Sequence, residues 1–124
     1  MLKDFVSKVY SECSDSRLIS STVAQQIKSV CLKTPDKFYN FIKDEPEFKT
    51  VEFGAYVCGL IELLHNKTEN SFEIPSWVFN DRYFLKKPYS SIHKYLKVSE
   101  NLKKVTPKEF SKRNYYTNEN GVLV

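Results

Sequence analysis

The stretch from Phe48 to Leu64 constrains the fold most, because its apolar residues surround a helical axis instead of lining one face of it. A helix that is apolar on all sides is stable in water only when other elements cover it. We therefore expect a central helix over residues 48–65. Gly54 and Gly59 lie inside it, and glycine costs up to about 1 kcal/mol relative to alanine in a helix. We expect another backbone to pass close to each glycine.

The residues before this stretch predict amphipathic helices. Apolar residues recur at spacings of three and four over residues 2–13 and again over 16–33, with polar residues between them. The Ser14-Asp15-Ser16 step ends the first helix and offers a cap for the second. Thr34-Pro35 is typical of a helix start, because threonine accepts from free amide groups and proline suits the first position. A short third helix should follow and end at the Glu45-Pro46 step.

The residues after the central stretch change in character. Residues 65–73 are polar and predict a surface loop. The segment from Trp77 to Tyr89 holds too many aromatic rings to lie in water, so part of it should pack on the core. A modest helical stripe then continues through Lys97.

Near the C-terminus, Thr106-Pro107-Lys108-Glu109 combines a cap, a first-position proline and a glutamate that can reach back to the threonine amide. We expect a helix through Phe110 to about Arg113, with Asn114 in the left-handed conformation that often ends helices. Asn120-Gly121 should then turn residues 122–124 into a short extended tail or half of a small hairpin.

These patterns predict an all-α fold: one domain over residues 1–124, a bundle of five to seven helices. The chain has 124 residues, close to the size of one domain, so two domains would each be too small for a core. With 3 glycines and 5 prolines it is also poor in the turn residues that a β-sandwich or barrel needs.

The sequence favours a cytoplasmic protein without a membrane span. Charged residues interrupt the first ten positions, which leaves no apolar segment of the kind that a secretory signal needs. The longest nearly uncharged run, residues 53–64, is shorter than the roughly 20 residues that cross a bilayer. Cys13, Cys31 and Cys58 are an odd number of thiols among apolar neighbours, which fits a reducing compartment.

The C-terminal block from Thr106 to Asn114, followed by Asn118-Glu119-Asn120, resembles the end of a family of small uncharacterised bacterial proteins. In that family a block T/S-P-x-x-F-x-x-R-N/G follows a region with a tryptophan and a proline before an aromatic residue, as Trp77 and Pro88-Tyr89 do here. The resemblance covers about the last third of the chain and implies a bacterial cytosolic protein. Such proteins can accompany nucleotidyltransferase-like partners as an antitoxin accompanies a toxin. The resemblance assigns no residue roles.

Groups for catalysis are few. His65 and His93 are the two histidines, and neither stands at a recognised spacing from a cysteine or a carboxylate. The cysteines are too far apart in sequence for paired zinc ligands, and the acidic run Asp44-Glu45-Pro46-Glu47 lacks the alternating carboxylates of a calcium loop. We expect no metal site, no cofactor and no catalytic residues.

Charge is distributed unevenly along the chain. Residues 1–79 hold 9 Lys and Arg against 11 Asp and Glu, a net charge of −2, whereas residues 80–124 hold 10 against 4, a net charge of +6. This basic C-terminal third, residues 80–124, also contains five tyrosines. Such a surface fits an acidic protein partner, or nucleic acid through phosphate contacts and base stacking, or a solvated lysine-rich face without a partner.

We identify seven candidate binding residues in the last half of the chain. Asp81 and Arg82 lie among the aromatics and should hold the segment 77–89 by pairing with the backbone or with Arg113. Helix-end preferences alone explain an arginine followed by an asparagine at residues 113 and 114. The candidates are Trp77, Asp81, Arg82, Tyr83, Lys112, Arg113 and Asn114.

The leading hypothesis is a non-enzymatic cytosolic interaction module that binds another protein, antitoxin-like if the resemblance holds. The first alternative is a nucleic-acid-binding accessory protein that uses the basic, tyrosine-rich third. The second is an enzyme of unknown class, which would need a pocket that gathers His93, Asp81, Arg82 and Tyr83.

Overall fold

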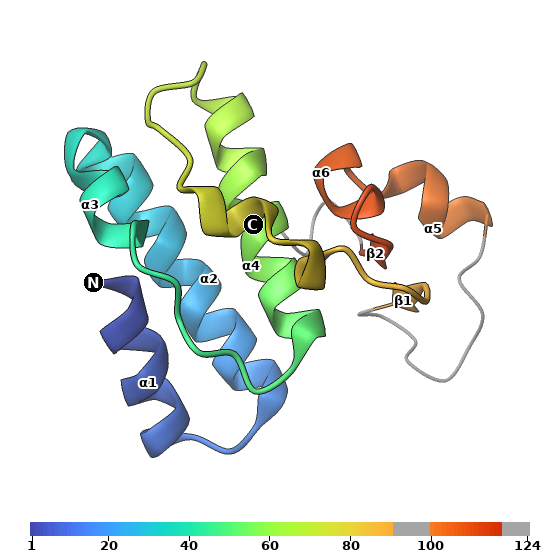
Figure 1. The fold of residues 1–124 in the computed structure, drawn as a ribbon, viewed down its shortest axis with the longest axis horizontal. Coiled ribbons are helices and arrows are strands. Elements are labelled where there is room, and N and C mark those ends of the chain that lie inside the picture. The colour runs from blue at the N-terminus through green and yellow to red at the C-terminus, as the bar shows by residue number, and fades with distance from the viewer. Residues whose placement is uncertain (91–99, 118–124) are drawn as a thin grey trace.

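The computed structural model describes residues 1–90 and 100–117, and it confirms the all-α class (Figure 1). Within these residues there are six α-helices, which agrees with the predicted five to seven. The helices are α1 (Leu2–Glu12), α2 (Ser16–Lys33), α3 (Phe38–Ile42), α4 (Val51–Lys67), α5 (Glu100–Val105) and α6 (Lys108–Ser111). Three 3-10 helices, η1 (Pro35–Lys37), η2 (Ser76–Phe79) and η3 (Asp81–Tyr83), and two short strands, β1 (Tyr89–Ser90) and β2 (Tyr115–Tyr116), complete them.

Helices α1 and α2 follow the predicted ranges to within one residue, because their apolar spacing places one face on the core. The buried side chains of α1 are Leu2, Val6 and Val9. The Asp15 side chain caps α2 and accepts hydrogen bonds from the amides of Arg17 and Leu18 at 2.9 and 3.2 Å. The step 14–16 therefore provides the cap that the sequence indicates.

The predicted role of Thr34 is wrong. Its side chain makes no cap bond to the following turn, and its hydroxyl instead donates to the carbonyl of Val30 at 3.0 Å, at the end of α2. Pro35 still opens η1, which runs directly into α3. The change of direction therefore depends on the proline, with the threonine closing the helix before it.

The central helix is confirmed as α4, which lies between α1–α3 and the C-terminal elements (Figure 1). It begins at Val51, where the Thr50 hydroxyl accepts from the Phe53 amide at 3.2 Å, and it ends at Lys67. The predicted start was three residues too early, and residues 65–67 continue the helix instead of beginning the loop.

Aromatic rings, not another backbone, fill the space beside the two glycines of α4. A Cβ on Gly59 would lie 2.5 Å from Cδ1 of Phe110, and one on Gly54 would overlap the ring of Tyr83. The expectation of a close approach was right, but the element that approaches is a side chain. Both rings come from the last half of the chain, so the glycines mark where that half docks.

Helix α6 and strand β2 pack on α4, on the side away from α1, and η2 and η3 also contact α4 (Figure 1). Strand β1 pairs in parallel with β2, with Tyr89 opposite Tyr115 and Ser90 opposite Tyr116. Buried apolar residues from both halves of the chain form one cluster around α4. The predicted stripe through Lys97 and the tail or half-hairpin at 122–124 lie outside the described residues.

The predicted capping box at Thr106 does not form, and α5, which precedes it, was not predicted. The Thr106 hydroxyl lies 2.6 Å from the carbonyl of Leu102 and 2.9 Å from that of Thr117, and it accepts from the Thr117 amide at 3.1 Å. The Glu109 carboxylate turns toward α4 and accepts from the Asn66 amide at 2.7 Å. Thr106 thus bonds to the preceding helix and to the residue after β2, and Glu109 bonds to α4, in place of the predicted reciprocal caps.

Candidate functional site

Arg113 is the centre of the joint between α4 and the C-terminal elements. It follows α6 and is fully buried. One guanidinium nitrogen donates to the carbonyl of Glu109 at 2.9 Å and another to the carbonyl of Val78 at 3.0 Å. The guanidinium also forms an ion pair with Glu62 of α4. Its Nε has no hydrogen-bond partner among the described residues.

Glu62 is the site residue that sequence reasoning missed. Its side chain is nearly buried, and Oε2 accepts from the ammonium of Lys112 at 2.6 Å. The signal was present, because Glu62 is the single charge in an otherwise apolar run of twelve residues, 53–64. A buried carboxylate needs a positive partner, but the sequence does not say which of the chain's cations supplies it.

Asn114 confirms the predicted left-handed ending, with a φ of 62°. Its side-chain amide donates to the carbonyl of Leu85 at 3.1 Å, and its own carbonyl accepts from the Tyr89 amide at 2.9 Å. The carbonyl of Arg113 accepts from the Leu85 amide at 3.0 Å. The pair 113–114 therefore fastens the segment before β1 to the segment before β2.

Trp77, Arg82 and Tyr83 form a second group, on the connection between α3 and α4. The indole nitrogen of Trp77 donates to the carbonyl of Ile42 at 2.9 Å. Arg82 forms an ion pair with Glu45, and the Tyr83 hydroxyl donates to the same carboxylate. We expected Asp81 and Arg82 to pair with the backbone or with Arg113, and for the Arg82 side chain this is wrong, because it pairs with Glu45.

Asp81 is exposed, and its backbone carbonyl accepts from the Phe84 amide at 3.0 Å. The structure therefore divides the seven candidates. Lys112, Arg113 and Asn114 lie at the α4–α6 joint, whereas Trp77, Arg82 and Tyr83 lie near Glu45, and Asp81 lies at the surface beside them.

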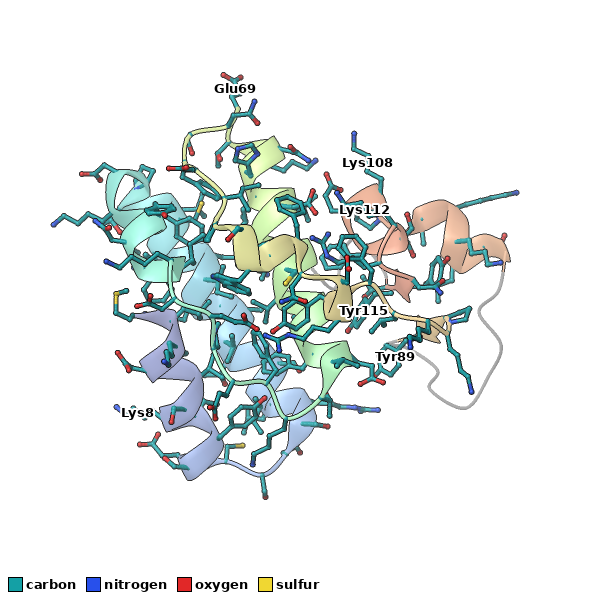
Figure 2. All side chains as sticks on the ribbon, viewed as in Figure 1. Lys8, Glu69, Tyr89, Lys108, Lys112 and Tyr115 are labelled. Carbon is teal, nitrogen blue, oxygen red and sulfur yellow. The ribbon has the colours of Figure 1, made fainter. Side chains whose placement is uncertain are left out.

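A cleft of about 710 Å³ lies between α4 and α6. We call it the α4–α6 cleft. Figure 2 shows Lys108 and Lys112 together at α6, on the side of the molecule opposite Lys8 of α1. The lining residues are Glu62, Asn66, Lys108, Glu109, Ser111, Lys112 and Tyr116.

Two further cavities, of about 560 and 520 Å³, adjoin the connection between α3 and α4. They share Lys3, Glu47 and Phe48 in their linings. The acidic run at 44–47 thus lies beside Lys3 and Arg82, so cations of the same molecule already neighbour it.

Burial suppresses the ionisation of two nucleophilic groups. Loss of solvent raises the pKa of Cys58 to about 12, with Arg113 lowering it and Glu62 raising it to a smaller extent. Burial likewise raises the pKa of Tyr83, against the lowering effect of Arg82. Cys58 is therefore a neutral thiol near pH 7. Because the thiolate is the reactive form of cysteine, this thiol is unreactive there.

Over 1–90 and 100–117, no group of three or more His, Cys, Asp and Glu side chains is placed to hold a metal ion. Within these ranges no helix combines the length and the apolar character that crossing a bilayer requires. His65 packs its ring against Phe72 at 5.3 Å between centroids, and His93 lies outside the described ranges.

Comparison of the chain with protein-family models, curated proteins and solved structures gave no match.

Proposed function

We propose that this protein acts without catalysis, by binding an acidic surface of another protein through its basic C-terminal third. The observation that carries the proposal is the exposure of charge in the stretches 82–90 and 101–117. In these stretches all six lysines are exposed and the one carboxylate, Glu109, is buried. The lysines are Lys86, Lys87, Lys103, Lys104, Lys108 and Lys112.

This distribution produces a positive surface because six lysines are exposed, whereas of the two carboxylates described in residues 80–90 and 101–117 Asp81 is exposed and Glu109 is buried. The Glu109 carboxylate is held by Asn66 at 2.7 Å. Complementary charge speeds association and selects partners. Lysine carries a mobile point charge, which suits an acidic protein surface. The two-pronged recognition of phosphate is typical of arginine instead.

Three groups that an enzyme could use, Glu62, Cys58 and Arg113, are buried in the described part of the chain. Arg113 and Glu62 pair with each other, and Cys58 is protonated near neutral pH. These engagements support a binding role. The three free cysteines support the cytoplasm as the place where it acts, and the resemblance of residues 106–114 adds a bacterial, antitoxin-like role to the proposal.

The test is co-purification of the tagged protein from its native host. We expect a stoichiometric protein partner that is retained after nuclease treatment and released by salt. The variant Lys104→Glu with Lys108→Glu should lose it, whereas Lys8→Glu with Lys33→Glu, an equal change of charge on α1 and α2, should keep it. Absence of a partner, or equal loss in both variants, would contradict the proposal. Recovery of nucleic acid in place of protein would favour the alternative.

A further inference from the structure

The α4–α6 cleft is lined by two lysines and two carboxylates, and Arg113, which is not part of the lining, contacts one of these carboxylates. Glu62 is contacted by two cations, Arg113 and Lys112, and the Glu109 carboxylate is bonded to the neutral amide of Asn66. Lys108 is the second lysine of the lining. The four charged side chains of the lining carry no net formal charge, and the five that include Arg113 carry +1.

Lys112 retains hydrogen-bond donors that Glu62 does not use. Glu62 is nine-tenths buried and lines the cleft, and its Oε1 is engaged by the ion pair with Arg113, so this acceptor takes no part in binding an anion. Lys112 has three donors, and one is used by Glu62. An anionic group placed at the mouth of the cleft would accept from Lys108 and from the remaining donors of Lys112.

The kind of anion follows from the donors that are present. Arg113 is fully buried and its nitrogens face Glu109, Val78 and Glu62, so its planar fork is closed to a ligand. The donors that reach the cleft are lysine ammoniums, which act as mobile point charges. Such donors can pair with the charge of a carboxylate on a flexible side chain without the fixed two-pronged geometry of arginine.

An aromatic ring lies next to these charges. Phe79 is 45% exposed, and the ammonium of Lys112 lies 5.7 Å from its ring centre. Protein interfaces combine an aromatic anchor that becomes buried with charged groups at the rim. The Phe79 ring next to Lys112 has this arrangement.

We infer that the α4–α6 cleft receives an Asp or Glu side chain of a protein partner between Lys108 and Lys112, while a neighbouring apolar residue of that partner covers Phe79. The inference rests on the proposed function and makes it specific. It assigns the decisive contact to the cleft and not to the other four exposed lysines of the C-terminal third.

The test uses a probe peptide of eight glutamates around one leucine, titrated at low salt into the ¹⁵N-labelled full chain. We expect the largest amide shifts at Asn66, Ser111 and Tyr116. Lys108→Glu should weaken binding about tenfold, the effect of a repulsive contact in place of an attractive one. The matched control Lys87→Glu makes the same change of charge outside the cleft and should weaken binding about twofold, a screened effect.

The outcomes separate this inference from the proposed function. Shifts centred on residues 86–87 or 103–104, with Lys108→Glu as mild as Lys87→Glu, would overturn the cleft assignment and leave the proposed function standing. No binding of the peptide by the wild-type protein would contradict the proposed function itself. Tighter binding of a single-stranded oligonucleotide of equal charge at the same amides would overturn the choice of a protein partner. If Phe79→Ser binds the peptide more weakly while its helical content is unchanged, the result would support the apolar contact.

Discussion

The helices α1–α4 and the elements from η2 to β2 are held by different kinds of contact. The first region buries apolar side chains that recur at helical spacing. The second is fastened by side chains that bond to distant backbone carbonyls, namely Trp77 to Ile42, Arg113 to Val78 and Asn114 to Leu85, over 35, 35 and 29 residues. Apolar contacts are shared among many atoms, whereas each of these bonds leaves a buried polar group when its partner is removed. We expect single substitutions to affect the second region more.

The largest effect is expected at Arg113. Arg113→Met removes two bonds to carbonyls and leaves Glu62 buried with Lys112 as its remaining cation. Loss of one partner of a buried pair costs about 3–5 kcal/mol. Urea unfolding followed by fluorescence of the one tryptophan, Trp77, reports the second region. That transition should shift to lower urea by more than the far-UV circular dichroism, which reports α1, α2 and α4.

Two controls test the cause. Lys112→Met removes the other cation that contacts Glu62. Because the Lys112 side chain is 44% exposed, its loss should cost less than about 1 kcal/mol. Glu62→Gln added to Arg113→Met removes the stranded charge and should restore part of the loss. Strictly additive effects would show that the two side chains are not coupled.

The glycine at the docking surface gives the next effect. Gly59→Ala improves helix propensity by up to about 1 kcal/mol, but the new methyl group meets the Phe110 ring at 2.5 Å. Overpacking costs about 1–3 kcal/mol, so we expect a net loss of stability in thermal unfolding. Adding Phe110→Leu should make Gly59→Ala less harmful. If Gly59→Ala stabilises the protein, the ring does not hold the position that we describe.

Sequence reasoning succeeded where the cause of structure is local. The bounds of α1 and α2, the central place of α4 and the left-handed Asn114 follow from spacing, capping and backbone preference. It failed where a side chain has both a local and a more distant hydrogen-bond partner within reach. Thr106 and Glu109 fit a capping box, yet they bond to Thr117 and Asn66. The site failed similarly, because a buried carboxylate at Glu62 indicates a cation without saying that Arg113, 51 residues later, supplies it.

A smaller effect is expected in the first region, at the cap of α2. Asp15→Ala removes the acceptor of the Arg17 and Leu18 amides. Loss of such a cap costs about 1 kcal/mol, and circular dichroism and tryptophan fluorescence should shift together. Asp36→Ala, which removes an equal charge from an exposed position in η1, should stay within about 0.5 kcal/mol of wild type. Equal losses in the two variants would assign the effect to net charge and not to the cap.

The smallest effect concerns the two buried thiols of the first region, Cys31 in α2 and Cys58 in α4. Burial raises the pKa of Cys58 from 9.0 to about 12 and also raises that of Cys31. The folded state therefore keeps protons that the unfolded chain releases, so this stabilisation is complete below pH 9 and is lost as the pH rises toward 12. At the unfolded pKa the free energy of unfolding changes by about 0.7 kcal/mol per pH unit for one thiol.

Unfolding free energies measured from pH 8.5 to 9.5 should fall, and Cys58→Ala should make the fall shallower by about that amount. Parallel curves for Cys58→Ala and wild type would mean that the thiol ionises equally in both states, and α4 would then be less enclosed by the second region than the structure describes.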